Sequence, residues 1–228
     1  MFQRLCFRFF RRVDLVAAVL CVVLGSASVG AQHGAVDGEW HAYGADNGAT
    51  KYSPLDQINA DNVDDLRIAW TRRTVDQSIL DVVPDLGYGN GNRATPLMVD
   101  GILYAPNAVG LVEAFNPGTG ETVWVQQPYD NDPRSYRGAA TRGVAYWADG
   151  DEERIIVQRG EWMYALHPKT GELYRDFGDN GRVDLTTGLS EGARYRWGSA
   201  PTVVRDVIVD TLQYLGVSPS TDYLARME

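Results

Sequence analysis

The chain has 228 residues, of which 44% are hydrophobic and 22% charged, so it is long enough for one domain with a buried core. Its formal net charge of −9 excludes a basic surface for phosphates, and nucleic acid is therefore not an expected partner. The 24 glycines, 10 prolines and 12 tyrosines favour many turns and strands over long helices.

Residues 1–31 have the pattern of a secretory signal peptide. Four arginines precede the apolar run Leu15–Leu24, and small residues lead to a cleavage position after Ala31. The apolar run is too short for a membrane anchor, and general secretion is favoured over the twin-arginine route. Cleavage would remove both cysteines, Cys6 and Cys21, so we expect an exported, acidic mature chain without a disulfide.

Residues 32–93 are predicted to form an irregular N-terminal segment with one short helix and one strand. The stretch Asn59–Trp70 starts with N-cap residues and acids, which predicts a short helix that runs into a strand at Ile68–Arg72. Residues 75–93 contain GYGNGN and predict a loop. Aromatic side chains in GEWHAYGADNGATKYSPLDQI are expected to anchor the segment: Trp40, Tyr43 and Tyr52.

From Ala94 onward the chain has the pattern of successive β-hairpins. ATPLMVDGILYAPNAVGLVEAFNPGTGETVWVQ predicts short antiparallel strands joined by tight turns, including Asp100-Gly101. A second unit starts at TRGVAYW, and a third starts at SAPTVVRD (Ser199) and is cut short. Three or four strands in roughly 50 residues is the size of a propeller blade. Residues 94–228 therefore predict two complete blades and a truncated third, which cannot close a ring without more chain or a partner.

A repeated turn supports this interpretation. EAFNPGTGETVW and YALHPKTGELYR both place a small residue, Ala114 or Ala165, before a Thr-Gly turn in which glycine can adopt positive φ. One copy is explained by an ordinary hairpin, whereas two copies at blade spacing favour a repeat. We expect Trp124 to fold over the next blade and donate its indole N–H there. Tyr174-Arg175 stand where the second copy would have tryptophan, which predicts a weaker contact.

The Ala-x-x-x-x-Thr-Gly-x-x-x-Trp pattern resembles the tryptophan-docking motif of the quinoprotein dehydrogenases, which use pyrroloquinoline quinone (PQQ). The segments GEWHAYGADNGATKYSPLDQINADNVDDLRIAW, ATPLMVDGILY, TRGVAYW and FGDNGRVDL are similar to the same family, and the last two are most like its glucose-dehydrogenase branch. The resemblance covers roughly residues 38–209. It implies an all-β fold, the first four-stranded antiparallel blades of an eight-bladed propeller. It also implies a periplasmic enzyme that oxidises alcohols or sugars and passes electrons to a cytochrome or a membrane quinone.

The resemblance also implies PQQ and Ca²⁺ as cofactors. The PQQ carboxylates need arginine or hydroxyl donors, and Arg142 matches the family arginine that approaches the cofactor. Ser199 and Ala200 match the segment of the third unit near the ring, whereas Gly198 replaces the threonine of many members. Arg93 stands where members commonly have glutamate, and this charge reversal suits a cofactor that carries carboxylates.

The catalytic aspartate, a further calcium ligand and the tryptophan floor would, by the resemblance, lie beyond residue 228. We therefore expect no catalytic residue and no metal ligand in this chain, and His33, His41 and His167 lack metal-site spacing. Val209–Gly216 also lacks the calcium-binding glutamate of the alcohol and methanol branches, as glucose-type members do. Three interpretations stay open: part of a PQQ-dependent dehydrogenase, a non-enzymatic propeller scaffold that binds proteins, or an inactive truncated remnant. Arg142 and the aromatic N-terminal segment favour the enzyme.

Overall fold

The computed structural model describes residues 35, 37–88, 92–129, 132–136, 141–187, 195–197, 199–204, 207–210, 212–214 and 223–226. Met1–His33 and Gly34–Glu228 are separate units, and only the second contains described residues. The predicted signal peptide and Gly198 lie outside the described residues. Within the described ranges, no helix is long and apolar enough to cross a membrane.

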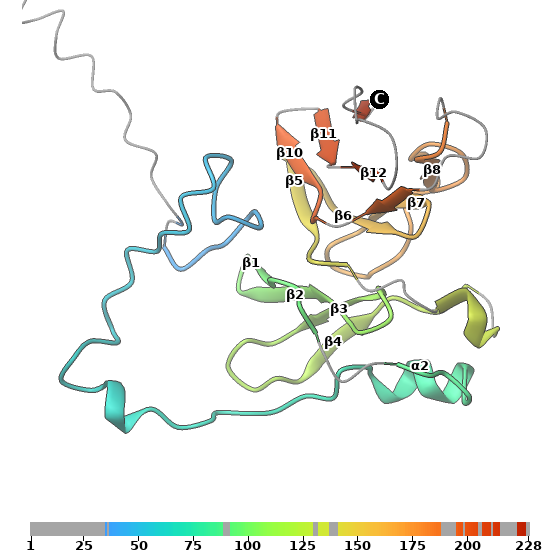
Figure 1. Ribbon diagram of the computed structural model, residues 1–228. Coiled ribbons are helices and arrows are strands. Elements are labelled where there is room, and N and C mark those ends of the chain that lie inside the picture. Colours follow the sequence, from blue (N-terminus) through green and yellow to red (C-terminus); the bar gives the residue numbers. More distant parts are fainter. Residues whose placement is uncertain are drawn as a thin grey trace, which may run out of the picture. The chain divides into compact units, whose positions relative to one another are not determined.

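The first unit of the repeat forms a four-stranded antiparallel sheet in the order β1-β2-β3-β4 (Figure 1). The predicted Asp100-Gly101 turn is confirmed, because Val99 pairs with Ile102 and the two turn residues have φ values of 49° and 75°. The strands closely follow the predicted hairpins: β1 Leu97–Val99, β2 Ile102–Pro106, β3 Val112–Phe115 and β4 Thr122–Val125.

The second unit forms a second four-stranded antiparallel sheet, in the order β5-β6-β7-β8. Its last strand lies inside FGDNGRVDL, the stretch in which the resemblance implied the end of a blade. The strands are β5 Ala145–Asp149, β6 Glu152–Arg159, β7 Trp162–Leu166 and β8 Arg182–Asp184. Two successive sheets of this kind confirm the predicted all-β blade architecture.

The third unit contains a three-stranded antiparallel sheet, β10-β11-β13, and a separate pair, β9 and β12. Strand β10 lies beside β5 of the second sheet. β1, β5 and β10 are each the first strand of a sheet, at its edge, and they are called the inner strands below. The bounds are β9 Tyr195–Trp197, β10 Thr202–Val204, β11 Val207–Asp210, β12 Leu212–Tyr214 and β13 Tyr223–Arg226.

The predicted helix and strand between Asn59 and Arg72 are only partly present. A single 3₁₀ turn, η1 Val63–Asp65, replaces the helix, and its N-cap Asn62 makes no side-chain capping bond. The predicted strand at Ile68–Arg72 was wrong, because in the described part of the chain this stretch pairs with no strand. Extended backbone alone does not make a strand, and Ile68 is 83% exposed.

The predicted loop at residues 75–93 was also wrong in part, because it contains the helix α2 Gln77–Val82. The Asp76 carboxylate caps this helix by accepting a 3.0 Å hydrogen bond from the Ser78 amide. Ile79 is fully buried in a cluster with Val75 and Val83. A second short helical turn, η2 Pro133–Tyr136, follows the first sheet.

Trp124 joins the two sheets, as predicted. Its indole N–H donates a 2.6 Å hydrogen bond to the Pro168 carbonyl in the second sheet's turn. Gly171 of that turn has a φ of 72°, and a Cβ atom there would overlap the indole. In the first sheet, Ala114 is paired with both Tyr104 and Trp124, whose ring centroids lie 6.0 Å apart. The small residue therefore lies between two rings.

Trp70 docks in the same way, which the sequence analysis did not predict. Its indole N–H donates a 2.8 Å hydrogen bond to the Pro117 carbonyl. A Cβ atom at Gly120, whose φ is also 72°, would lie 2.6 Å from the Trp70 ring. The N-terminal segment therefore contacts the first sheet as the first sheet contacts the second.

Candidate functional site

The starts of the three inner strands lie next to one another. The Thr95 amide donates a 2.9 Å hydrogen bond to the Arg142 carbonyl, and Thr95 and Gly143 form a parallel bridge. A Cβ atom at Gly143 would lie only 3.1 Å from the Cβ of Ala200. The residues that precede β1, β5 and β10 are thus brought together at one end of the sheets.

All four predicted cofactor-binding residues belong to these strand starts. Arg93 and Arg142 are exposed, Ser199 is partly buried and Ala200 is buried. Among the residues that the structure describes, no carboxylate forms an ion pair with either arginine. The structure therefore places two exposed arginines, without a described acidic partner, just before inner strands whose starts adjoin.

The backbone before Arg93 is held by Asn92. The Asn92 side-chain oxygen accepts a 3.0 Å hydrogen bond from the Ala94 amide, and its nitrogen donates to the Pro106 carbonyl at 3.3 Å. Pro106 is the last residue of β2, so this contact ties the start of β1 to the end of its neighbour.

The connection from the first sheet to the second leaves from the same end. Because the strands are antiparallel, the end at which β1 and β5 start is also the end at which β4 and β6 finish, at Val125 and Arg159. Arg159 is buried, and its guanidinium donates to the Val109 carbonyl at 3.2 Å and to the Ser135 carbonyl at 2.6 Å. One side chain therefore holds two connections together.

Tyrosine rings surround the Arg159 guanidinium. Its central carbon lies 4.8 Å from the Tyr129 ring centre and 4.5 Å from that of Tyr136. Burial lowers the pKa of Arg159 to about 10. Arg159 was not predicted from the sequence, because its partners are backbone carbonyls of remote connections, which no motif marks.

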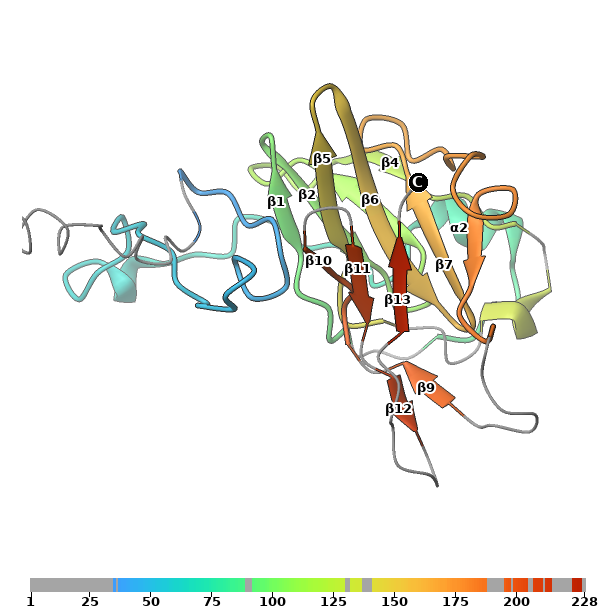
Figure 2. The same cartoon turned by 90° about the horizontal axis from the view of Figure 1, so that it is seen from above.

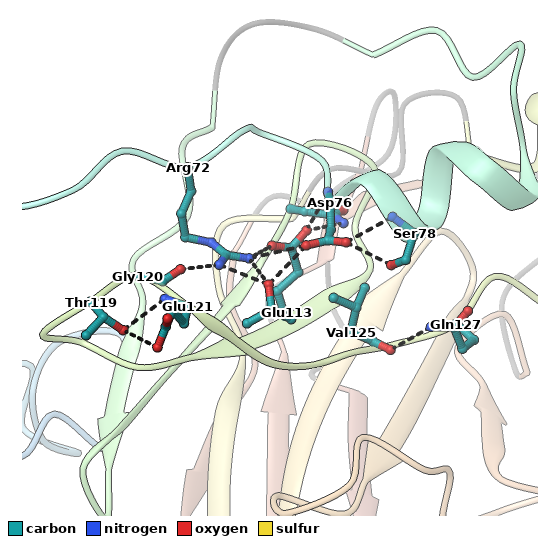
Figure 3. Close-up of polar contacts among 11 residues, drawn as sticks. Arg72, Asp76, Ser78, Glu113, Thr119, Gly120, Glu121, Val125 and Gln127 are labelled. Atoms are coloured by element: carbon teal, nitrogen blue, oxygen red, sulfur yellow. Dashed lines mark hydrogen bonds and ion pairs between the residues drawn. The ribbon is translucent and has the colours of Figure 1, made fainter.

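A second guanidinium fastens the N-terminal segment to the first sheet (Figure 3). Arg72 lies 2.9 Å from the buried carboxylate of Glu113 and also donates to the Gly120 carbonyl. The other Glu113 oxygen accepts from the Asn107 side chain at 3.0 Å and from the Asp76 amide at 3.1 Å. Both charged groups are therefore largely buried and hydrogen-bonded, which offsets the cost of removing them from water.

Asp76 belongs to the same network. Partial burial raises the pKa of its carboxyl, but hydrogen bonds from Ser78 and Thr122 and the charge of Arg72 together outweigh burial. The pKa of Asp76 consequently lies below its ordinary value of 3.8.

A cavity of about 620 Å³ is lined by the N-terminal segment, strand β5 and one residue of β10, and its lining includes neither of the two exposed arginines. Its lining includes Asp37, Glu39, His41 and Asp46. Glu39 already pairs with His41 at 3.0 Å, and Asp46 accepts two hydrogen bonds from Thr50. Across the described residues, no group of three or more histidine, cysteine, aspartate or glutamate side chains is arranged to hold a metal ion.

Comparison with known proteins agrees with the fold. The family model described as "PQQ: Glucose/ethanol/alcohol dehydrogenase, beta-propeller domain" matches residues 40–220. Quinoprotein glucose dehydrogenase A of Acinetobacter calcoaceticus is 31% identical over 171 residues, which cover 67% of this chain and 21% of that protein. The 1-butanol dehydrogenase (cytochrome c) of Thauera butanivorans is 33% identical over 194 residues, covering 83% and 24%.

A solved structure is similar in fold. The quinohemoprotein alcohol dehydrogenase of Comamonas testosteroni superposes with a TM-score of 0.56 at 27% identity, covering 77% of this chain and 23% of that one. The chain thus spans about a fifth to a quarter of the length of these relatives. It belongs to the glucose/ethanol/alcohol dehydrogenase family of proteins with a PQQ β-propeller domain.

Proposed function

We propose that this chain forms part of the cofactor site of a PQQ-dependent dehydrogenase that oxidises an alcohol or a sugar. The observation that carries the proposal is the position of Arg93 and Arg142. Both residues are exposed and lie just before inner strands whose starts adjoin, and neither has an acidic partner among the described residues. Membership of the family supports the identity of the ligand.

The residues present suit the chemistry of PQQ, a planar ring system with three carboxylates. Arginine can bind a carboxylate through two parallel hydrogen bonds, and the Ser199 hydroxyl adds a further polar contact. Gly143 and Ala200 are small, which lets the three strand starts that would hold the cofactor pack closely together. When bound, the quinone supplies a two-electron acceptor for oxidation of a C–OH group, and a divalent cation such as Ca²⁺ makes it more electrophilic.

We further propose that the protein is exported to the periplasm by cleavage of residues 1–31 and passes electrons to a cytochrome or a membrane quinone. The charged and apolar pattern of that segment supports export. The name of the Thauera relative gives cytochrome c as the acceptor of that protein. Because the resemblance puts the catalytic aspartate and a further calcium ligand outside this chain, we expect these residues to bind PQQ without turning over substrate.

Isothermal titration of the purified chain with PQQ, in the presence and absence of Ca²⁺, tests the proposal. We expect saturable binding that Arg142→Gln weakens about tenfold or more, since the variant loses a charge-assisted bond. Arg67→Gln is the matched control, because Arg67 donates only to the nearby carbonyls of Asp64 and Leu66. Absence of binding, or equal weakening by both variants, would contradict the proposal.

Dye reduction with glucose and with ethanol adds a second test. We expect no turnover by the 228-residue chain under conditions in which PQQ binds. Measurable turnover would show that the chain holds its own catalytic group, and would overturn that part of the proposal.

A further inference from the structure

The N-terminal segment reaches the inner edge of the first sheet. The Trp40 amide donates to the Met98 carbonyl at 2.8 Å, and the Met98 amide donates back at 3.0 Å. The His41 ring lies 5.2 Å from the ring of Tyr146 on β5. The segment therefore pairs with the edge of β1 that does not pair with β2, and it also contacts β5. Figure 2 shows the segment next to β1.

A tight turn follows these contacts. The Ala45 amide donates a 3.0 Å hydrogen bond to the Ala42 carbonyl, which puts Tyr43 and Gly44 at the tip. A Cβ atom at Gly44 would lie 2.6 Å from the Cα of Ala49, so the chain packs tightly behind the tip. The backbone of the turn that carries Tyr43 is therefore closely packed.

Tyr43 meets the strand junction described above. A Cβ atom at Gly143 would lie 3.7 Å from the Tyr43 ring, 3.1 Å from the Ala200 Cβ and 3.3 Å from the Thr95 carbonyl oxygen. Despite this contact, Tyr43 is 38% exposed. One part of the ring packs on the junction, and the rest of it is open.

We propose that Tyr43 is a cofactor-contacting residue, whose ring forms an aromatic wall of the PQQ site. This inference rests on the proposed function. Its warrant is a juxtaposition: the partly exposed ring lies against Gly143, and Arg142 is the preceding residue. An aromatic surface beside guanidinium groups suits a ligand that is both flat and multiply anionic. The ring would limit the tilt of the quinone while the arginines hold its carboxylates.

Calorimetric titration with PQQ and Ca²⁺ compares wild type with three variants. We expect Tyr43→Ala to weaken binding about three- to tenfold, the worth of one aromatic contact, and Tyr43→Phe to stay within about twofold. Tyr52→Ala is the matched control, because Tyr52 lies on the same segment and is 59% exposed. We expect it to bind like wild type.

A second measurement uses the unaltered chain. Nitration of surface tyrosines by tetranitromethane, followed by peptide mass spectrometry, should be slowed by PQQ at Tyr43 and unchanged at Tyr52. The inference would be overturned if the wild-type chain binds PQQ, Tyr43→Ala does not weaken that binding, and PQQ does not slow nitration of Tyr43. That result would leave the proposed function standing. Absence of wild-type binding would overturn both.

Discussion

The two complete sheets share a Pro-x-Thr-Gly turn but fasten the chain that follows it in different ways. In the first sheet, β4 directly follows the turn, and the indole N–H of Trp124 on β4 donates to the Pro168 carbonyl of the second sheet. In the second sheet, Tyr174 instead donates a 3.0 Å hydrogen bond to the Glu153 carbonyl of its own sheet. The turn presents an aromatic residue in both cases, and the side chain decides whether two sheets are joined.

The second sheet contacts the third unit by other means. A buried cluster holds Ile156 and Met163 of the second sheet, Phe177 between β7 and β8, Leu185 just after β8, and Ile208 of β11. No indole takes part in this cluster as described. Apolar packing therefore replaces the combined packing and hydrogen bonding of Trp124.

The two sheets also differ in how they pair a guanidinium. Arg72 lies 4.7 Å from the Phe115 ring centre, and Arg154 lies 4.6 Å from that of Tyr174. The carboxylate that pairs with Arg72 is buried Glu113, whereas Asp176, 3.4 Å from Arg154, is 69% exposed. The two arginines thus make similar contacts with aromatic rings, but the carboxylate paired with Arg72 is buried and the one paired with Arg154 is exposed.

The largest expected effect is on the sheet junction. Trp124→Ala should lower the free energy of unfolding by about 3–5 kcal/mol, because it removes a large buried ring and a hydrogen bond. Tyr174→Ala should cost about 1–2 kcal/mol, since that ring is only partly buried. Urea unfolding of both variants measures the difference, and equal losses would break the comparison.

The buried charge pair should rank second. Glu113→Gln should cost about 3 kcal/mol, because the mostly buried Arg72 charge would lose its closest carboxylate and keep only Asp76, at 3.7 Å. Asp176→Asn should change the free energy of unfolding by about 0.5 kcal/mol or less, as for exposed pairs. If Asp176→Asn lowered the free energy of unfolding as much as Glu113→Gln, burial would not explain the difference expected between the two ion pairs.

Much of the architecture follows from local patterns in the sequence. The hairpin at Asp100-Gly101 and the docking of Trp124 were predicted, because glycine turns and a single flanking indole are local signals. Helix α2 was missed, although Val75, Ile79 and Val83 recur at intervals of four, which is a helical spacing.

The remaining features depend on contacts between distant parts of the chain. Trp70 has no Pro-x-Thr-Gly turn before it in its own segment, and Arg72 meets Glu113 only after folding. The Tyr43 turn also runs against local preference, because Ala45 and Ala49 adopt positive φ without being glycine. Arg93 and Arg142 were predicted as site residues from the resemblance, and the structure shows that their strand starts adjoin.

Two glycines of the second sheet test whether the Pro-x-Thr-Gly turn needs glycine for contact with the Trp124 ring. Gly171 and Gly160 both have positive φ, but only a side chain at Gly171 would meet Trp124. Gly171→Ala should cost about 2–3 kcal/mol, combining backbone strain with the clash, and Gly160→Ala about 1 kcal/mol from strain alone. Thermal unfolding measures the stability lost by each variant. Equal losses for Gly171→Ala and Gly160→Ala would contradict the contact between Gly171 and the Trp124 ring.

The smallest expected effect concerns acid. Because the folded pKa of Asp76 lies below 3.8, its ionised form stabilises the fold above that pH, and the contribution is lost as pH falls through the folded pKa. Asp76→Asn should therefore be less stable than wild type at pH 7, and the gap should narrow below about pH 4. Chemical unfolding at pH 7 and pH 3 checks this, and a gap that widens in acid would reverse the assigned sign.

Hydrogen exchange of the Trp124 indole N–H, followed by NMR of the purified chain, tests the central claim most directly. If the two sheets are neighbouring blades joined by this ring, the N–H bonded to the Pro168 carbonyl should exchange far more slowly than that of free tryptophan. Exchange at the rate of free tryptophan would mean that the blades are not held together in this way.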